Sequence, residues 1–376
     1  MSGTAYTGWA RPLLADRPLK TPGYYYSVDV MAADMRTLQA VLGTPLVMQL
    51  SACPLPDVLS RLPEDVRFGV VSASRAEMNM VIAWATEHAY VHAPALDPQL
   101  ARAVLGAGHR AIVETPRQIA LLAELRGRRV VKPVLLGLDM SVLGEEGNGR
   151  GLDRDGALVA VDAAREAGIA IGGVALLRRE AFHAGRACAS VHAAAALVSE
   201  LEARAGASMS TLLLGEWTGT LGDEDGLALY RAAIATLPPH LQPLHEAGDA
   251  VFGRAGVFVT RVVDTVRVGP VQRAICDATL ASAFLLSEAA GSQRRGGAPA
   301  VLDPAAEGPG ATLVEGGSGL PGDRYGTIAG PVATGELVVI PDAGAWCRTY
   351  APGALKGLGA APSFLLAAAV EEVSDA

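Results

Sequence analysis

Two patterns of apolar residues alternate along the first two thirds of the chain. Short apolar runs such as 68–71 and 211–214 predict buried strands, whereas segments such as 116–126 and 187–205, with apolar residues three or four positions apart, predict helices. A strand recurs about every 20 to 25 residues, and a helix follows each strand. Repeats of this kind fold as right-handed parallel β/α units, so the pattern predicts an α/β fold, most simply a (β/α)8 TIM-like barrel.

The pattern changes at Gly256. The segments 257–268 and 271–280 are rich in β-forming residues, 287–312 is rich in Gly, Ala and Pro, and 336–340 has the pattern of a further strand. These features predict a separate β domain that contains one long loop. The predicted organisation is an N-terminal segment that joins the β domain (1–30), the barrel (31–255) and a C-terminal β-barrel or β-sandwich domain (256–376).

Composition agrees with a large two-domain protein. The chain has 376 residues, of which 50% are hydrophobic, and its formal net charge is −8. Because no run of Lys and Arg interleaved with aromatic residues occurs, a nucleic-acid partner is not expected. Lysine is scarce, and Lys20, Lys132 and Lys356 are the three in the sequence.

Cysteine usage and hydropathy bear on localisation. The four cysteines, Cys53, Cys188, Cys276 and Cys347, show no CxxC pairing, which favours reduced and mostly buried thiols in a cytoplasmic protein. The first residues lack a basic segment followed by a long apolar run, so no signal peptide is expected. No uninterrupted apolar stretch of about 18 residues predicts a membrane span.

Several stretches resemble motifs of one enzyme family. Residues 73–78 read Ala-Ser-Arg-Ala-Glu-Met, 246–260 contain Glu-Ala-Gly-Asp followed by Ala-Gly-Val-Phe-Val-Thr, and 335–346 end in Asp-Ala-Gly-Ala-Trp. In order and spacing they resemble motifs of the fold-type III decarboxylases, which depend on pyridoxal phosphate (PLP) and include ornithine, diaminopimelate and arginine decarboxylases. The resemblance implies an alanine-racemase-like barrel, a C-terminal β domain and a homodimer with shared sites.

The same resemblance locates where the family's PLP chemistry would lie. The stretch Met48–Leu59 is similar to the family's Tyr-Ala-Val-Lys-x-Asn strand and the turn that follows it. When the Asp-Val-Leu ends of the two stretches are matched, Ser51 corresponds to the family's lysine that forms the imine (Schiff base) with PLP. Serine has no amine and cannot form that imine. The family's phosphate-binding glycine turn corresponds to Gly215-Glu216-Trp217, and its phosphate-binding Arg to Asp249. Carboxylates at these positions oppose a phosphate dianion, so we predict that no PLP is bound.

Other family positions are also changed. The His beneath the cofactor ring corresponds to Leu177, the catalytic Cys to Gly319, and the Tyr near the phosphate to Trp346. The resemblance retains Glu246, Asp277 and Asp323.

These positions make up the predicted site. We expect a pocket with carboxylates beside aromatic faces, which suits a cationic ligand such as an amine, and in which one carboxyl group with a raised pKa acts as a general acid or base. The candidate catalytic residues are Glu216, Asp249, Asp277 and Asp323. The candidate ligand-binding residues are Ser51, Cys53, His92, Leu177, Trp217, Glu246, Gly319 and Trp346. No metal site is predicted, although His92 together with the acids remains an alternative.

Four side chains have simpler interpretations. His88 and His92 have ligand spacing, but they are predicted to straddle a helix–strand boundary and not to share a face. Cys53 is interpreted as a buried thiol, with a nucleophile as the alternative. Glu114 is assigned a structural role.

The sequence thus leads to three hypotheses of function. The first is a PLP-independent, repurposed enzyme of decarboxylase fold that acts on a small amine- or amino-acid-derived molecule in small-molecule (secondary) metabolism. The second is a catalytically inactive pseudo-decarboxylase that serves as a binding or dimer partner. The third is a genuine PLP-dependent amino-acid decarboxylase.

Overall fold

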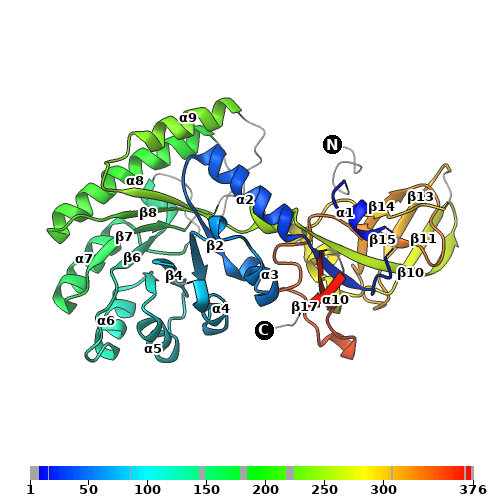
Figure 1. Ribbon diagram of the computed structural model, residues 1–376, viewed down its shortest axis with the longest axis horizontal. Coiled ribbons are helices and arrows are strands. Elements are labelled where there is room, and N and C mark those ends of the chain that lie inside the picture. Colours follow the sequence, from blue (N-terminus) through cyan, green and yellow to red (C-terminus); the bar gives the residue numbers. More distant parts are fainter. Residues whose placement is uncertain are drawn as a thin grey trace. The chain divides into compact units, whose positions relative to one another are not determined.

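The computed structural model describes residues 8–15, 17–84, 86–143, 149–177, 184–216, 224–305, 308–367 and 370–373. The chain divides into two compact units (Figure 1). The barrel unit comprises Ala33–Ser51 and Pro63–Ala250, and the sheet unit comprises Met1–Ala32, Ala52–Leu62 and Val251–Ala376. The short segment Ala52–Leu62 thus belongs to the sheet unit, although the sequence pattern places it within the barrel.

The barrel unit is a closed ring of eight parallel strands. Its strands are β2 (Leu46–Gln49), β3 (Gly69–Ser72), β4 (His88–His92), β5 (Arg110–Val113), β6 (Val134–Leu138), β7 (Ile171–Leu176), β8 (Thr211–Glu216) and β9 (Gln242–Ala247). The predicted α/β barrel is therefore confirmed.

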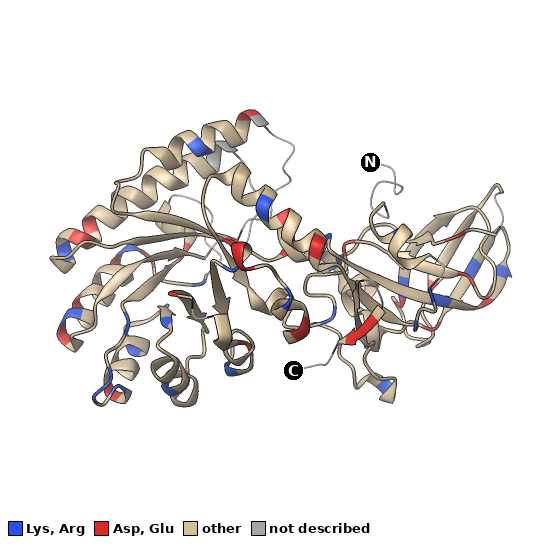
Figure 2. Ribbon diagram, in the orientation of Figure 1, with Lys and Arg blue, Asp and Glu red and all other residues tan. Residues whose placement is uncertain are grey.

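Helices cover the outside of the ring (Figure 1). They are α4 (Arg75–Met80), α5 (Pro98–Ala107), α6 (Pro116–Leu125), α7 (Arg154–Ala167), α8 (Ala184–Ala205) and α9 (Glu224–Ala235), while α2 (Val28–Leu42) precedes β2. Basic residues (Lys and Arg) and acidic residues (Asp and Glu) are interspersed along these helices (Figure 2). Such mixed charge is typical of solvated helix faces.

Local sequence explains where several helices begin and end. Asp97 accepts hydrogen bonds from the backbone of Gln99 and Leu100, and Pro98 occupies the first position of α5. Gly108 ends that helix in a left-handed conformation (φ +66°), which glycine adopts without steric cost. Thr115 and Asp153 cap α6 and α7 in the same way.

The barrel interior is filled by one apolar side chain from each strand. These are Val47, Val71, Tyr90, Ile112, Leu135, Ala175, Leu213 and Leu244. Because side chains alternate along a strand, this layer fixes which other residues face the inside of the barrel. Residues two positions further along a strand lie on the same face and closer to its C-terminal end.

The sheet unit is built on a nine-stranded mixed sheet. Its strands are β1 (Gly23–Tyr26), β10 (Gly256–Val268), β11 (Val271–Cys276), β12 (Ala300–Val301), β13 (Ala311–Glu315), β14 (Arg324–Ala329), β15 (Leu337–Ile340), β16 (Ser363–Leu366) and β17 (Val370–Val373). Three short helices, α1 (Ala10–Leu14), α3 (Pro56–Ser60) and α10 (Leu280–Ala283), complete it. Strand β1 pairs with β10 and β16, so the N-terminal segment joins the β domain.

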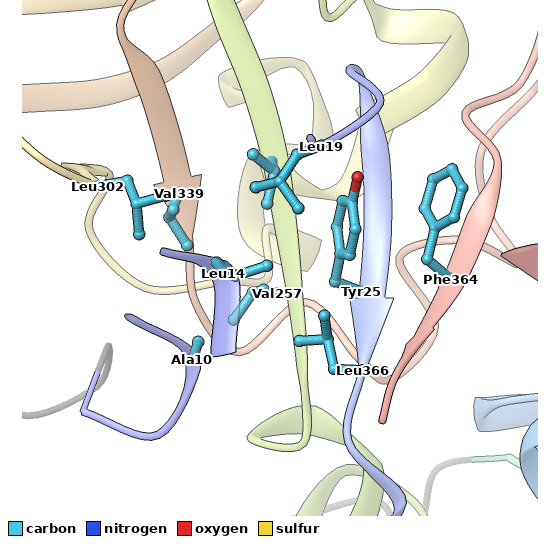
Figure 3. Packing of buried hydrophobic residues seen from close by; sticks show 10 residues of the cluster. Ala10, Leu14, Leu19, Tyr25, Val257, Leu302, Val339, Phe364 and Leu366 are labelled. Carbon is cyan, nitrogen blue, oxygen red and sulfur yellow. The ribbon is translucent and has the colours of Figure 1, made fainter. Parts of the chain in front are cut away.

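One core of this unit gathers residues distant in sequence (Figure 3). Tyr25 of β1 stacks on Phe364 of β16 with 4.8 Å between ring centroids, and Leu14 and Val257 belong to the same buried cluster. Burying aromatic rings of this size contributes strongly to the stability of a domain.

Candidate functional site

The C-terminal ends of the eight barrel strands form a mouth lined by polar side chains. In (β/α)8 barrels this end carries the active site, because the loops that follow the strands converge there. We use the term mouth for Gln49, Ser51, Glu77, His92, Glu114, Asp139, Arg150, Leu177, Glu216, Glu246 and Asp249, which all belong to the barrel unit.

A β-bulge places two carboxylates side by side at the mouth. The register between β8 and β9 shifts after Leu213, so that Glu216 lies directly opposite Glu246. Gly215, within the shift, has φ +82°, a conformation that favours glycine. Bulges of this kind re-aim a side chain, and they are frequent next to active sites. The sequence therefore supplies a backbone device that pairs the two acids.

Glu246 has a strongly raised carboxyl pKa. It lies two residues beyond Leu244 of the interior layer and is 6% exposed. Burial, together with the neighbouring Glu216 carboxylate, raises the pKa of Glu246 to about 8. Glu216 in turn accepts a hydrogen bond from the backbone of Asp249 at 3.3 Å. At neutral pH Glu246 is thus largely protonated and able to donate a proton.

Gln49 is the last residue of β2 and faces the same interior. It follows Val47 of the interior layer by two residues, and β2 pairs directly with β9, with Val47 opposite Glu246. Among the described residues, its side-chain oxygen Oε1 is buried and has no hydrogen-bond partner. Buried acceptors without a partner are uncommon in folded proteins.

The opposite side of the mouth holds a His–Glu–Arg network. His92 Nε2 lies 2.8 Å from Glu114 Oε1, and Arg150 Nη2 donates to the same oxygen at 3.3 Å. The backbone N–H of Gly151 donates to the other oxygen at 2.9 Å. The hydrogen bond from His92, followed by the charges of His92 and Arg150, holds the pKa of Glu114 below its usual range, against an opposing effect of burial. Since β5 and β9 are four strands apart around the closed ring, Glu114 and Glu246 line opposite sides of the mouth.

Ser51 and Leu177 complete the lining. Ser51 lies in the 3-10 turn after β2 and donates to Glu77 Oε1 at 2.9 Å. Burial raises the pKa of Glu77, although two hydrogen bonds oppose that effect. Leu177 follows β7, and a Cβ built on Gly137 would lie 3.3 Å from Glu114 Cγ and 3.4 Å from Leu177 Cδ1. The missing side chain at Gly137 leaves room beside Glu114.

None of the three lysines lies in the mouth. Lys132 is exposed and precedes β6 by two residues, so it lies at the N-terminal end of the barrel, opposite the mouth. Lys20 and Lys356 belong to the sheet unit, where Lys20 pairs with Glu372 and Lys356 donates to the carbonyl of Ser318.

Two predicted catalytic acids have structural partners within the sheet unit. Asp277 accepts hydrogen bonds from Thr21, Thr260 and the backbone of Arg261. Asp277 also lines a cavity of about 440 Å³ in that unit. Asp323 is 4% exposed and accepts from the Tyr325 hydroxyl and the backbone of Ser318.

The remaining predicted ligand-binding residues also lie outside the barrel unit or outside the described chain. Gly319 lies in the turn between β13 and β14 with φ +67°. Trp346 has φ +65° and a buried indole N–H without an acceptor among the described residues. Trp217 lies outside the described residues. Cys53 is 2% exposed, and burial raises its thiol pKa to about 12, which supports the buried-thiol interpretation over a nucleophile.

The prediction for the histidine pair is wrong. His88 and His92 are both on β4, whose side chains at alternate positions share one face, so they lie on the same side of the strand. They occupy its two ends with Tyr90 between them, and the Tyr90 hydroxyl lies 3.3 Å from His88 Nδ1. Among the described residues no group of three or more His, Cys, Asp or Glu is arranged to hold a metal ion.

The helices that the structure describes include none that is long and apolar enough to cross a membrane.

Comparison of the sequence with models of known families and with curated proteins gives no match. Solved structures do match. Lysine/ornithine decarboxylase from Vibrio vulnificus complexed with putrescine has a TM-score of 0.80 and 17% identity, covering 97% of this chain and 99% of that one. The chain has the fold of the fold-type III decarboxylases.

Two further structures with this fold match over nearly their whole length. The Paramecium bursaria Chlorella virus arginine decarboxylase bound to agmatine has a TM-score of 0.82 and 13% identity, covering 96% of this chain and 100% of that one. Diaminopimelate decarboxylase from Helicobacter pylori complexed with L-lysine has a TM-score of 0.81 and 14% identity, with 95% of both chains covered. The resemblance found in the sequence is thus confirmed at the level of the fold.

Sequence reasoning missed two residues of this decarboxylase-fold mouth, Gln49 and Arg150. Glu114, which the sequence analysis assigns a structural role, is the centre of the His92–Arg150 network. The spacing of Val47 and Gln49 in one strand was a usable signal for Gln49. No pattern signalled Arg150, because it lies in the loop between β6 and α7.

Proposed function

We propose that the barrel mouth binds a small amine-containing cation and acts on it without PLP, with Glu246 as the group that holds a transferable proton. The observation that carries the proposal is the bulge-paired Glu216 and Glu246. Two carboxylates about 4 Å apart repel each other by about 4 kcal/mol at an effective dielectric constant near 20. A proton or a bound cation relieves that repulsion, so the pair favours a positively charged ligand.

The residues of the mouth do not fit PLP. An imine requires a lysine amine, and the mouth has Gln49 and Ser51 at the end of its first strand and the turn that follows. A phosphate dianion requires N–H groups or cations, and Glu216 at the end of β8 brings a carboxylate. Both features support PLP-independence.

The ligands of the structural neighbours suggest probes. The Vibrio vulnificus enzyme was solved with putrescine and also with cadaverine, and the viral arginine decarboxylase with agmatine. These ligands belong to those proteins, but they are small cations of the class that an acidic mouth would attract.

The test is binding of putrescine and agmatine, measured by calorimetry and by the rise in melting temperature. We expect both amines to bind and the uncharged analogue 1,4-butanediol not to bind. The variant Glu216→Gln removes one carboxylate and is expected to weaken binding about tenfold or more, whereas Glu124→Gln, on the exposed face of α6, leaves it unchanged. Equal behaviour of putrescine and butanediol would sink the proposal.

A second experiment addresses the cofactor. The protein is mixed with PLP, reduced with borohydride and digested for mass spectrometry. We expect no adduct. A stoichiometric reduced adduct on one lysine, well above the labelling of the other exposed lysines, would contradict PLP-independence. If an amine binds but is recovered unchanged after long incubation, the protein is a binder, as the pseudo-decarboxylase hypothesis holds.

A further inference from the structure

The strongest unassigned feature of the barrel unit is the buried side-chain oxygen of Gln49. Strand β2 lies between β3 and β9, so the inward side chain of Gln49 emerges next to the strand that carries Glu246. Its Oε1 atom is out of contact with solvent and has no donor within hydrogen-bond reach among the described residues. A buried acceptor without a donor destabilises the folded protein unless a ligand donates to it.

We propose that Gln49 is a ligand-binding residue of the mouth whose Oε1 accepts a hydrogen bond from the same cationic group that Glu216 and Glu246 neutralise. The inference rests on the proposed function and extends it to a residue and to a ligand class. Gln49 and Glu216 face the ligand with acceptor oxygens, and the protonated carboxyl of Glu246 keeps an oxygen that can accept as well. A primary ammonium or an amidinium group, which carries several N–H donors, matches this arrangement.

A neutral amide suits this position for an electrostatic reason. A third carboxylate would add repulsion to a pair that burial already disfavours. An amide oxygen supplies a hydrogen bond to the ligand without further negative charge. Gln49 therefore orients the bound cation through a hydrogen bond, while the Glu216–Glu246 pair supplies the negative charge that attracts it.

The first test needs no ligand. In Gln49→Lys, the side-chain ammonium reaches the position proposed for the cationic group of the ligand. Gln49→Met is the control, because its side chain has a similar length and no charge. Infrared difference spectra, assigned with Glu246→Gln, follow the protonated carboxyl of Glu246 as pH changes. We expect the Gln49→Lys titration to move to lower pH by about one unit or more, because an adjacent cation favours the carboxylate. We expect the Gln49→Met titration to remain near that of the wild type.

The second test uses putrescine and agmatine. We expect Gln49→Met to weaken binding about tenfold, as for a lost hydrogen bond to a charged group, and Gln49→Lys to abolish it. Gln242→Met is the matched control, because Gln242 is exposed at the opposite end of β9. Circular dichroism and melting curves establish that each variant is folded.

The outcomes separate this inference from the proposed function. If the wild type binds the amines and Gln49→Met binds them equally well, Gln49 is no ligand contact and the proposed function stands. If neither amine binds but Gln49→Lys shifts the Glu246 titration, the placement of Gln49 beside the acids is supported and those two amines are ruled out. If Gln49→Lys folds and the Glu246 titration is unmoved, position 49 does not reach the acids and the inference is overturned.

Discussion

Burial and the neighbouring Glu216 carboxylate raise the pKa of Glu246 to about 8, and this makes stability depend on pH. In the unfolded chain the pKa of Glu246 is near 4.3, so the folded protein binds this proton more tightly than the unfolded chain does. The tighter binding contributes stability in full below pH 4–5. That contribution is lost as pH rises towards 8. On the order of 3–5 kcal/mol of unfolding free energy is expected to disappear across this range.

The variant Glu246→Gln keeps the shape and removes the titration. We expect its free energy of unfolding, measured by urea denaturation from pH 5 to pH 8, to fall much less than that of the wild type. Glu124→Gln, at an exposed position, should follow the wild-type curve. Parallel curves for wild type and Glu246→Gln would show that Glu246 is ionised throughout.

A second residue-scale prediction concerns the outer face of β9. His245 is 2% exposed, with Nδ1 2.6 Å from the Thr44 hydroxyl and Nε2 2.7 Å from the Tyr230 hydroxyl. Replacing it by Phe removes the hydrogen bonds that its ring forms with both hydroxyls, so we expect a loss of about 2–4 kcal/mol of unfolding free energy. Tyr230→Phe removes only one partner and should cost about 1 kcal/mol. A larger loss for Tyr230→Phe than for His245→Phe would contradict this account.

At the scale of the element, the bulge in β8 is the device that pairs the acids. Gly215→Ala introduces a Cβ at φ +82°, which is strained for any residue but glycine, and we expect a loss of about 1–2 kcal/mol. Because the bulge would relax, Glu216 would move away from Glu246, and amine binding and the Glu246 titration should both change. Denaturation, calorimetry and infrared titration measure these three effects.

The matched control for the bulge is Gly108→Ala. Gly108 has φ +66° at the end of α5, and no atom lies within 4 Å of a Cβ placed there. The variant Gly108→Ala should show a similar loss of stability, with no change in amine binding or in the titration of Glu246. If both variants bind amines like the wild type, the bulge does not position the site.

The same element shows where sequence reasoning succeeds and where it stops. Apolar runs and caps such as Thr115 predict strands and helices, because burial and local hydrogen bonding decide them. The pairing of Glu216 with Glu246 depends on a register shift between two strands, and Gly215 alone does not reveal which residue of β9 Glu216 will face.

Family motifs carried the prediction of fold further than that of the site. They place Glu246 and Glu216 on the barrel, and these two residues do meet in the structure. The motifs give no signal for Gln49, whose inward direction follows from closure of the ring and from the position of Val47 in the interior layer.

At the scale of the whole molecule, the prediction that remains is the homodimer. The resemblance implies a dimer with shared sites, and we expect light scattering after size exclusion to give twice the chain mass of 38.6 kDa at micromolar concentration. Glu246→Gln should give the same mass, because Glu246 lies inside the barrel unit. A mass of one chain would remove the idea of a site shared between subunits. Asp277 and Asp323 would then keep only the roles that their hydrogen bonds to Thr260 and Tyr325 assign them within the sheet unit.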